Sequence, residues 1–218
     1  MKENKRQQMV QRQLVARDIR DARVLGAFTE LAREAFVPSA IAAHAYEDRP
    51  LPIGDEQTIS QPYIVALMLE SLALKGHERV LEIGTGSGYS AALLGRLAKE
   101  VYTVERIVSL AAQARARLER SGADNVHVRV GDGTLGWPEH APYDAIVVAA
   151  GGPDIPTALI SQLSPGGRLV MPVGTDEASQ VLVRVTGDAS GHLHKTILCD
   201  VRFVPLIGEQ GFSERRSR

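Results

Sequence analysis

The sequence predicts an α/β fold: a doubly wound, mostly parallel sheet of seven strands, with helices before it and an antiparallel hairpin at its C-terminal end. Three observations predict this class. Short apolar runs alternate with helical stretches from Glu78 onward, and one such run ends in a glycine-rich turn at residues 84–88. The last two apolar runs follow each other without room for a crossover helix. The 218 residues, 44% of them hydrophobic, can bury one substantial core, so we expect a single domain over 1–218.

Composition and periodicity divide this domain into four segments. We expect N-terminal helices and an ordered loop, then a ligand-binding core, a C-terminal hairpin and a polar tail, over residues 1–77, 78–174, 175–208 and 209–218 respectively.

The first segment contains helices and an irregular stretch. Apolar residues recur at helical spacing between Lys5 and Leu31, which predicts two helices. Residues 46–62 hold several prolines and a glycine, which prevent a regular helix and predict an ordered loop. Pro62 suits the first position of a helix that continues toward Lys75.

The core and the hairpin contain the predicted strands. Alternation of apolar runs with helical stretches is typical of a parallel sheet with helices on both faces. After these runs, residues 181–185 and 193–204 flank a turn at 187–191 and predict an antiparallel hairpin. The five runs assigned to the parallel part are 80–83, 101–104, 126–130, 145–148 and 168–171.

Charge and composition exclude several classes of function. A formal net charge of -1 provides no basic field for a polyanion, so we expect no nucleic-acid partner. The N-terminus is polar, and no apolar run approaches the roughly 18 residues of a membrane span, which predicts a cytoplasmic protein without a membrane partner. Cys199 is the only cysteine and excludes an intramolecular disulfide. His192 and His194 lack a third ligand, so we expect no metal.

The strongest local signal is the segment VLEIGTGSGY at residues 80–89, a strand followed by a glycine turn that opens a helix. A dinucleotide fingerprint would require glycine or alanine where Tyr89 stands. The carboxylate of Glu82 would repel a pyrophosphate and would suit the ammonium of a methionine moiety. The segment therefore predicts S-adenosylmethionine rather than NAD as cofactor. The candidate contacts of the turn are Gly84, Thr85, Gly86, Ser87 and Gly88.

Two further acids follow the next two strands. Glu105 comes about twenty residues after the glycines, where an acid can accept both ribose hydroxyls, and Asp132 can accept from the adenine amino group. We include their neighbours Arg106 and Gly133 among the candidate cofactor contacts. The alternatives are that Glu105 forms a solvated ion pair with Arg106 and that Asp132 is a turn residue.

Hydroxyl side chains alternate in the predicted loop. Thr58 and Ser60 flank Ile59, so in an extended chain both hydroxyls project to one side and could bracket one carboxylate. The simpler alternative is that Ser60 caps the helix that begins at Pro62.

Several longer segments add to these motifs, among them PLPIGDEQTISQPYIVA (50–66), VYTVERI (101–107), LSPGGRLVMPVG (163–174) and VRFVPL (201–206). With them the sequence resembles the protein-L-isoaspartate O-methyltransferase family from Met9 to Leu206. Asp18 and Glu56 depart from the family pattern, because glycine is more familiar at both positions. Glu56 borders the presumed substrate loop, whose turn geometry or affinity it could alter.

The resemblance implies a class I, Rossmann-like methyltransferase. It would transfer a methyl group from S-adenosyl-L-methionine to the α-carboxylate of L-isoaspartyl residues in damaged proteins and peptides, leaving S-adenosyl-L-homocysteine and starting repair through a succinimide. It implies Ser60 as the catalytic residue, Thr58 and neighbouring Ile59 as substrate contacts, and closure of Val204 and Pro205 over the peptide. We also expect a monomer.

The chemistry is consistent with the lack of an obvious base in the sequence. A carboxylate with an ordinary pKa of about 3.5 is already ionised at neutral pH, so methyl transfer needs positioning rather than proton abstraction. A nucleic-acid amino methyltransferase is disfavoured by the apolar segment 149–152, and a nicotinamide-dependent oxidoreductase by Tyr89 and Glu82. Another class I methyltransferase acting on a small carboxylate, and a non-catalytic cofactor-binding module, remain alternatives.

Overall fold

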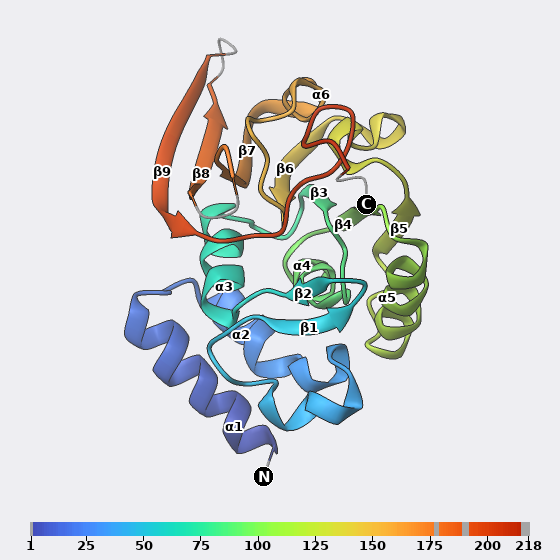
Figure 1. Ribbon diagram of the computed structural model, residues 1–218. Helices are drawn as coiled ribbons and strands as arrows, with labels where there is room; N and C mark the ends of the chain where they lie inside the picture. The colour runs from blue at the N-terminus through green and yellow to red at the C-terminus, as the bar shows by residue number, and fades with distance from the viewer. Residues whose placement is uncertain (1, 177–178, 189–191, 215–218) are drawn as a thin grey trace.

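The computed structural model describes residues 2–176, 179–188 and 192–214 of the 218-residue chain. Its centre is a seven-stranded sheet with the strand order β5-β4-β3-β6-β7-β8-β9 (Figure 1). The predicted fold class is confirmed, including the antiparallel strands at the C-terminal end. Of the predicted turn and tail, residues 189–191 and 215–218 lie outside the described residues. The strands are β3 (Arg79–Ile83), β4 (Glu100–Glu105), β5 (Val126–Val130), β6 (Tyr143–Val148), β7 (Leu163–Val173), β8 (Gln180–Gly187) and β9 (Leu193–Val201).

The sheet changes from parallel to antiparallel along its width. β3 pairs in parallel with β4 on one side and with β6 on the other, whereas β8 runs antiparallel to both β7 and β9. The chain order therefore reverses at β3, between the β4–β5 half and the β6–β7 half. Open α/β sheets bind ligands at such a switch point, beside the carboxyl ends of the strands.

Helices precede the sheet, and α-helices also connect its parallel strands, except that two 3₁₀ segments connect β5 to β6. The two predicted N-terminal helices are present, the first continuing through one π-helical and one 3₁₀ segment to Arg17. Pro62 occupies the first turn of α3, as predicted. Within the described residues, no helix combines the length and apolar character needed to cross a bilayer. The helices are α1 (Lys2–Met9), α2 (Ala22–Glu30), α3 (Pro62–Ser71), α4 (Tyr89–Leu97), α5 (Val108–Arg120) and α6 (Thr157–Ser161).

The core lies on both faces of the sheet because side chains of a strand alternate between faces. Val80 of β3 packs into a buried cluster with α2, α3, α4 and α5, whereas its neighbour Leu81 packs into a second cluster with α6. Ala145 and Ile146 of β6 divide in the same way. This burial on both faces explains why the parallel strands appear in the sequence as nearly continuous apolar runs.

The stretch that we expected to be an ordered loop contains a β-hairpin, which corrects that prediction. β1 (Leu51–Gly54) pairs antiparallel with β2 (Gln57–Ile59) in front of the N-terminal helices (Figure 1). The prolines, which exclude a regular helix, are tolerated here because this sheet has two strands, both of them edges. The turn residues Asp55 and Glu56 have φ of 50° and 58°, as in the type I′ turn that joins short hairpins.

Both departures from the family pattern fall at left-handed backbone positions. Asp18 has a φ of 66° and Glu56 a φ of 58°, where a β-carbon is sterically unfavourable and glycine is not. We expect Glu56→Gly to raise the free energy of unfolding by about 0.5–1 kcal/mol, the left-handed penalty less the added freedom of the unfolded glycine. Asp18→Gly should gain less, because aspartate tolerates this region. Urea unfolding measures both.

Glu56→Ala is the matched control for this prediction. Alanine also lacks the carboxylate but keeps the β-carbon, so its free energy of unfolding should stay within a few tenths of a kcal/mol of the original chain. Equal stabilisation by glycine and alanine would show that the charge, and not the backbone conformation, is responsible.

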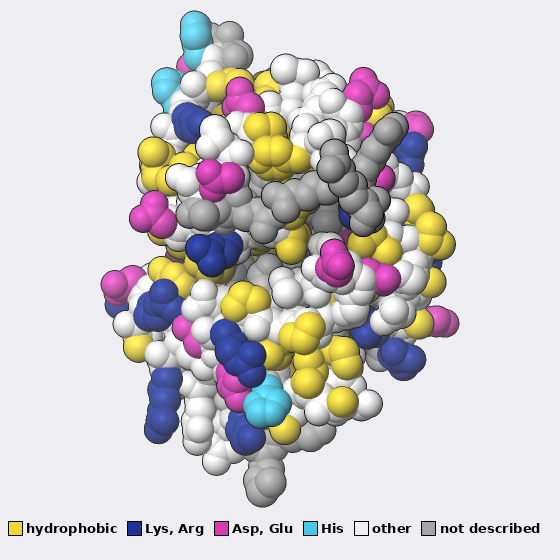
Figure 2. Space-filling model, in the orientation of Figure 1, with side chains coloured by type: hydrophobic (Ala, Val, Ile, Leu, Met, Phe, Trp, Pro, Cys, Tyr) yellow, Lys and Arg dark blue, Asp and Glu magenta, His cyan; other side chains and the backbone are white. Residues whose placement is uncertain are grey.

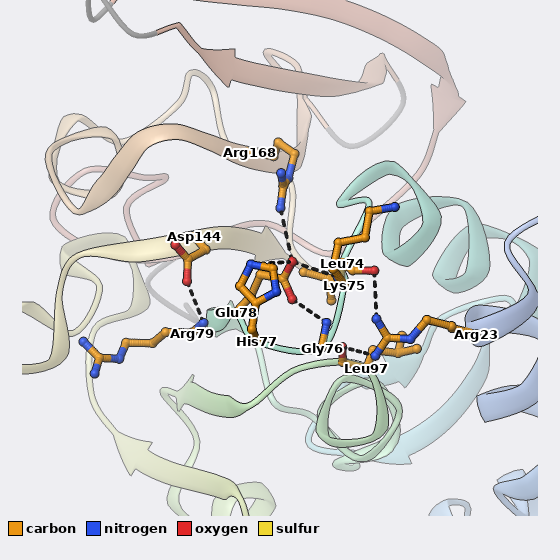
Figure 3. Close-up of polar contacts among 10 residues, drawn as sticks. All are labelled: Arg23, Leu74, Lys75, Gly76, His77, Glu78, Arg79, Leu97, Asp144 and Arg168. Carbon is orange, nitrogen blue, oxygen red and sulfur yellow. Dashed lines mark hydrogen bonds and ion pairs between the residues drawn. The ribbon is translucent and has the colours of Figure 1, made fainter.

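Polar contacts fix the end of the sheet opposite the ligand edge (Figure 3). The buried carboxylate of Glu78 accepts hydrogen bonds from the backbone N–H groups of Lys75 and Gly76 at 2.7 and 2.8 Å. Nearby, Arg23 of α2 donates to the carbonyls of Leu74 and Leu97 at 3.1 and 2.8 Å. These bonds tie α2 and the end of α4 to the connection between α3 and β3.

Candidate active site

A cavity lies at the carboxyl ends of β3, β4 and β6, the edge where the strand order reverses. The β1–β2 hairpin forms one wall, the glycine turn after β3 another, and the segment after β9 a third. That last segment, which we call the C-terminal strap (residues 204–214), crosses this edge of the sheet (Figure 1). Most predicted site residues line the cavity: Thr58, Ile59, Ser60, Gly84, Thr85, Gly86, Ser87, Glu105, Arg106, Gly133, Val204 and Pro205.

The glycine turn leaves room for a ligand against its backbone. Gly84 and Gly86 have φ of 91° and 53°, which side-chain-bearing residues rarely adopt. A β-carbon on Gly86 would lie 3.4 Å from Ile53 of the hairpin, within the space between the two walls. Gly88, with φ 88°, caps the N-terminus of α4 instead and does not line the cavity.

Glu105 ends β4 with its carboxylate at the cavity wall. One oxygen accepts the backbone N–H of Gly86 at 2.9 Å and the other accepts that of Ile107 at 3.0 Å. A carboxylate has roughly four acceptor positions, so two remain for hydroxyl groups. Arg106 pairs with Glu214 of the strap at 3.1 Å and not with Glu105. Among the described residues, therefore, the alternative of a Glu105–Arg106 ion pair is not observed.

Glu82 lies beneath the cavity and does not line it. Its side chain is fully buried, and one oxygen accepts a hydrogen bond from the hydroxyl of Thr103 at 2.6 Å. The hydroxyl oxygens of Thr103 and Thr85 are also 2.6 Å apart, within hydrogen-bond distance. The other carboxylate oxygen of Glu82 has no hydrogen-bond partner among the described residues. Burial raises the pKa of Glu82 to about 7; the Thr103 and Ser90 hydroxyls oppose this shift and the charge of Glu105 adds to it.

Asp132 also lies outside the cavity lining, because the strap and the following turn use its carboxylate. One oxygen accepts the backbone N–H and the hydroxyl of Thr134 at 2.8 and 2.7 Å, and the other accepts the backbone N–H of Glu209 at 2.8 Å. Burial raises the pKa of Asp132, but these hydrogen bonds outweigh it, so the pKa is lower than usual and the group is charged. Asp132 thus fixes the strap next to Gly133, which does line the cavity.

Ser60 lies where the hairpin wall meets α3. It lines this cavity and a smaller adjoining one that also involves Thr58, Arg202 and Val204. The N-cap of α3 is Gln61, and no side chain caps that helix end. Ser60 therefore does not cap the helix, and the simpler interpretation of this residue is wrong.

The strap is bound to the loop after β6. The carbonyl of Val204 accepts the N–H of Gly151 at 2.8 Å, and the N–H of Leu206 donates to the carbonyl of Gly151 at 2.8 Å. Val204 and Pro205 are thereby positioned over the cavity, beside Ser60 in its lining.

Several lining residues were not predicted. Tyr89 and Ser90 begin α4 directly after the glycine turn, so their place next to the motif was an available signal. Val65 and Met68 line the cavity from one face of α3 but appear in the sequence as ordinary core residues at helical spacing. Leu206 follows Pro205 in the strap, and only the tertiary course of the strap identifies it.

The lining fits S-adenosylmethionine. The glycine turn would admit a ligand against its backbone, Glu105 retains acceptor capacity for ribose hydroxyls, and apolar side chains such as Ile83 and Val104 can enclose a base. A pyrophosphate would meet the carboxylate of Glu105, with Arg106 as the lining cation among the described residues. The arrangement can hold a cationic nucleoside beside a second, hydroxyl-lined pocket.

Comparison with known proteins gives one consistent family. A family model described as protein-L-isoaspartate(D-aspartate) O-methyltransferase (PCMT) matches residues 4–211. The protein-L-isoaspartate O-methyltransferase 2 of Marinobacter nauticus is 58% identical over 207 residues, covering 95% of this chain and 94% of the relative. Protein-L-isoaspartate O-methyltransferase 1 of Rhodopseudomonas palustris is 57% identical and covers 95% and 85%.

Solved structures resemble the whole fold. A protein-L-isoaspartate O-methyltransferase structure superposes with a TM-score of 0.84 at 32% identity, covering 94% of this chain and 67% of the other. A structure described as the β-aspartate methyltransferase of Plasmodium falciparum, in complex with S-adenosyl-L-homocysteine, has a TM-score of 0.80 at 25% identity and covers 93% and 98%.

Proposed function

The chain belongs to the protein-L-isoaspartate(D-aspartate) O-methyltransferase family, and on that premise we propose which of its residues bind the cofactor and which bind the substrate. The enzyme transfers a methyl group from S-adenosyl-L-methionine to the α-carboxylate of L-isoaspartyl residues in damaged proteins. One observation supports our assignment of roles most directly: the hydroxyl-bearing hairpin, the glycine turn and Glu105 line the same cavity.

We assign the cofactor to the glycine-turn side. The backbone of residues 84–88 would lie against the methionine moiety, with the buried carboxyl group of Glu82 beneath it on the side of its ammonium. Glu105 would accept the ribose hydroxyls. Gly133 and Arg106, which line the cavity, would flank the adenosine. Asp132 lies outside that lining and would accept from the adenine amino group only with the acceptor capacity that Thr134 and Glu209 leave open. When bound, the cofactor supplies a methyl group on a positively charged sulfur.

We assign the substrate to the hairpin side. Ser60 would donate a hydrogen bond to the α-carboxylate and direct one oxygen toward the methyl group, with Thr58 and the backbone at Ile59 completing the contacts. Val204 and Pro205 would cover the peptide. The carboxylate needs no base, because it is ionised at neutral pH. These residues would act by orientation and by keeping water away from charges that cancel during the transfer.

The methyl ester then completes the repair without further help from the protein. The neighbouring backbone amide nitrogen attacks the ester carbonyl, methanol leaves, and the resulting succinimide opens partly to normal aspartate. Ester formation therefore commits the damaged residue to repair.

Paired peptides test this function. With labelled S-adenosyl-L-methionine, we expect methyl incorporation into an isoaspartyl peptide and a rate at least a hundredfold lower for the same peptide with normal aspartate, whose side-chain carboxylate is displaced by one methylene from the reactive position. Equal rates on the two peptides would contradict the proposal, and so would a failure to bind S-adenosyl-L-homocysteine in calorimetry.

We further propose that the protein acts as a cytoplasmic, single-domain monomer without a nucleic-acid partner. Lys, Arg, Asp and Glu side chains are interspersed on the face shown in Figure 2, in keeping with the net charge of -1. Size-exclusion chromatography with light scattering tests the oligomeric state.

A further inference from the structure

Arg33 is a buried cation next to the proposed substrate pocket. It begins the 3₁₀ segment Arg33–Phe36 and is fully buried, yet it does not line the cavity. Among the described residues, no carboxylate lies within ion-pair distance of it. Burial of an unpaired charge is costly, so a chain that retains one at this place requires an explanation.

The guanidinium group holds two backbone carbonyls on different segments. Its Nε donates to the carbonyl of Ala45 at 2.7 Å, and its Nη2 donates to the carbonyl of Ser60 at 2.8 Å. Its Nη1 is buried without a partner among the described residues. The guanidinium carbon also lies 5.0 Å from the ring centroid of Tyr89, the first residue of the helix that follows the glycine turn.

The group remains charged under ordinary conditions. Burial lowers the pKa of Arg33 to about 10, while Tyr89 and Tyr46 partly offset that effect. The two hydrogen bonds are therefore donated by a cation, which makes them shorter and stronger than bonds between neutral groups.

We infer that Arg33 is a positioning residue for the methyl transfer: through the Ser60 carbonyl it fixes the backbone that presents the Ser60 hydroxyl to the substrate carboxylate. This inference rests on the proposed role of Ser60. Ser60 lies at the junction between β2 and α3 and does not cap the helix. The hydrogen bond that the described structure shows for Ser60 is the one that its carbonyl accepts from Arg33. A reaction that depends on orientation is sensitive to small displacements of such a residue.

Arg23 provides a matched control for a purely structural role. It too holds two backbone carbonyls, those of Leu74 and Leu97, but at the opposite end of the sheet (Figure 3). Replacing it with lysine changes the same kind of contact without touching the cavity or the hairpin.

The test is a double-mutant cycle that combines Arg33→Lys with Ser60→Ala. Lysine keeps the charge but offers one nitrogen, so it cannot hold both carbonyls with the geometry of the guanidinium fork. We expect Arg33→Lys to lower kcat/KM for an isoaspartyl peptide about tenfold and, in the Ser60→Ala background, to lower it less than twofold. Arg23→Lys should lower kcat/KM less than twofold in both backgrounds.

Cofactor affinity distinguishes this role from general damage to the site. Calorimetry should show Arg33→Lys binding S-adenosyl-L-homocysteine within about threefold of the original chain, because Arg33 does not line the cavity. If Arg33→Lys is unfolded at the assay temperature, Arg33→Gln, which can hold one carbonyl, enters the same cycle.

Three results would overturn the inference while leaving the methyl transfer itself intact. They are an unchanged kcat/KM for the Arg33 variant, an equal further loss in the Ser60→Ala background, or the same loss for the Arg23 variant. A failure of the original chain to methylate the isoaspartyl peptide would instead contradict the proposed function.

Discussion

Replacing Ser60 with alanine is expected to lower kcat/KM for an isoaspartyl peptide by roughly ten- to a hundredfold, the loss of one hydrogen bond to a charged group, about 1.5–3 kcal/mol. The effect should appear mainly in kcat if the hydroxyl orients the carboxylate in the transition state more than in the ground state. Steady-state kinetics with labelled S-adenosyl-L-methionine measures it.

The control variant is Ser71→Ala. Ser71 lies at the other end of α3, where its hydroxyl donates to the Leu67 carbonyl of the same helix at 2.7 Å. It should leave kcat/KM unchanged, and both serine variants should bind S-adenosyl-L-homocysteine like the original chain. A loss of less than twofold for Ser60→Ala would exclude the proposed catalytic role of Ser60.

The site could be predicted from the sequence where one residue determines one local feature. The glycine turn after β3 and the acid at the end of β4 follow from the strand pattern alone, because parallel strands bring their carboxyl ends to one edge. Gly84 and Glu105 accordingly line the cavity. Asp18 and Glu56 were noticed only as departures from a pattern, and their left-handed backbone supplies the physical reason why glycine suits them.

Other features depend on contacts between segments that are distant in sequence. The N–H that Asp132 accepts belongs to Glu209, 77 residues away, so no local pattern could indicate that this acid holds the strap. Arg33 is 27 residues from Ser60, and in the sequence it resembles any surface arginine. The β1–β2 hairpin was missed because Pro50 and Pro52 exclude a regular helix and the segment was assigned to a loop. Both strands of a two-stranded sheet are edges, where proline is permitted.

Glu82 is a buried acid whose protonation should govern stability near neutral pH. It is fully enclosed, one of its oxygens has no hydrogen-bond partner among the described residues, and the charge of Glu105 lies nearby. Burial raises its pKa to about 7, against an ordinary value of 4.5 in the unfolded chain. The folded protein therefore binds this proton more tightly than the unfolded chain does.

The direction of the pH effect follows from that difference. Below about pH 4.5 both states carry the proton, so ionisation of Glu82 does not change the free energy of unfolding. Between pH 4.5 and 7 the unfolded chain loses the proton first, so stability falls as the pH rises. Above about pH 7 both states are ionised and the loss of stability is constant, about 3 kcal/mol for a pKa difference of this size.

Glu82→Gln removes this dependence and leaves the shape of the side chain nearly unchanged. Urea unfolding measures the free energy of unfolding of both proteins at pH 5 and pH 8. The difference, variant minus original chain, should be about 2–3 kcal/mol larger at pH 8 than at pH 5. Any fixed cost of the amide in the pocket is the same at both pH values and cancels. An unchanged difference between the two proteins would mean that Glu82 is ionised throughout and that its burial has been compensated.

Glu78→Gln is the control, because the pKa of Glu78 is shifted in the opposite direction to that of Glu82. Burial raises the pKa of Glu78, but the backbone N–H groups of Lys75 and Gly76 more than offset this, so its pKa lies below its ordinary value. Its carboxylate therefore adds stability above the unfolded pKa, and that contribution is lost as the pH falls through the lower folded value. Removing it should destabilise the protein at both pH 5 and pH 8 by similar amounts. The two buried acids, Glu78 just before β3 and Glu82 within it, would then respond to pH differently because backbone N–H groups donate to the carboxylate of Glu78 and none donates to that of Glu82 among the described residues.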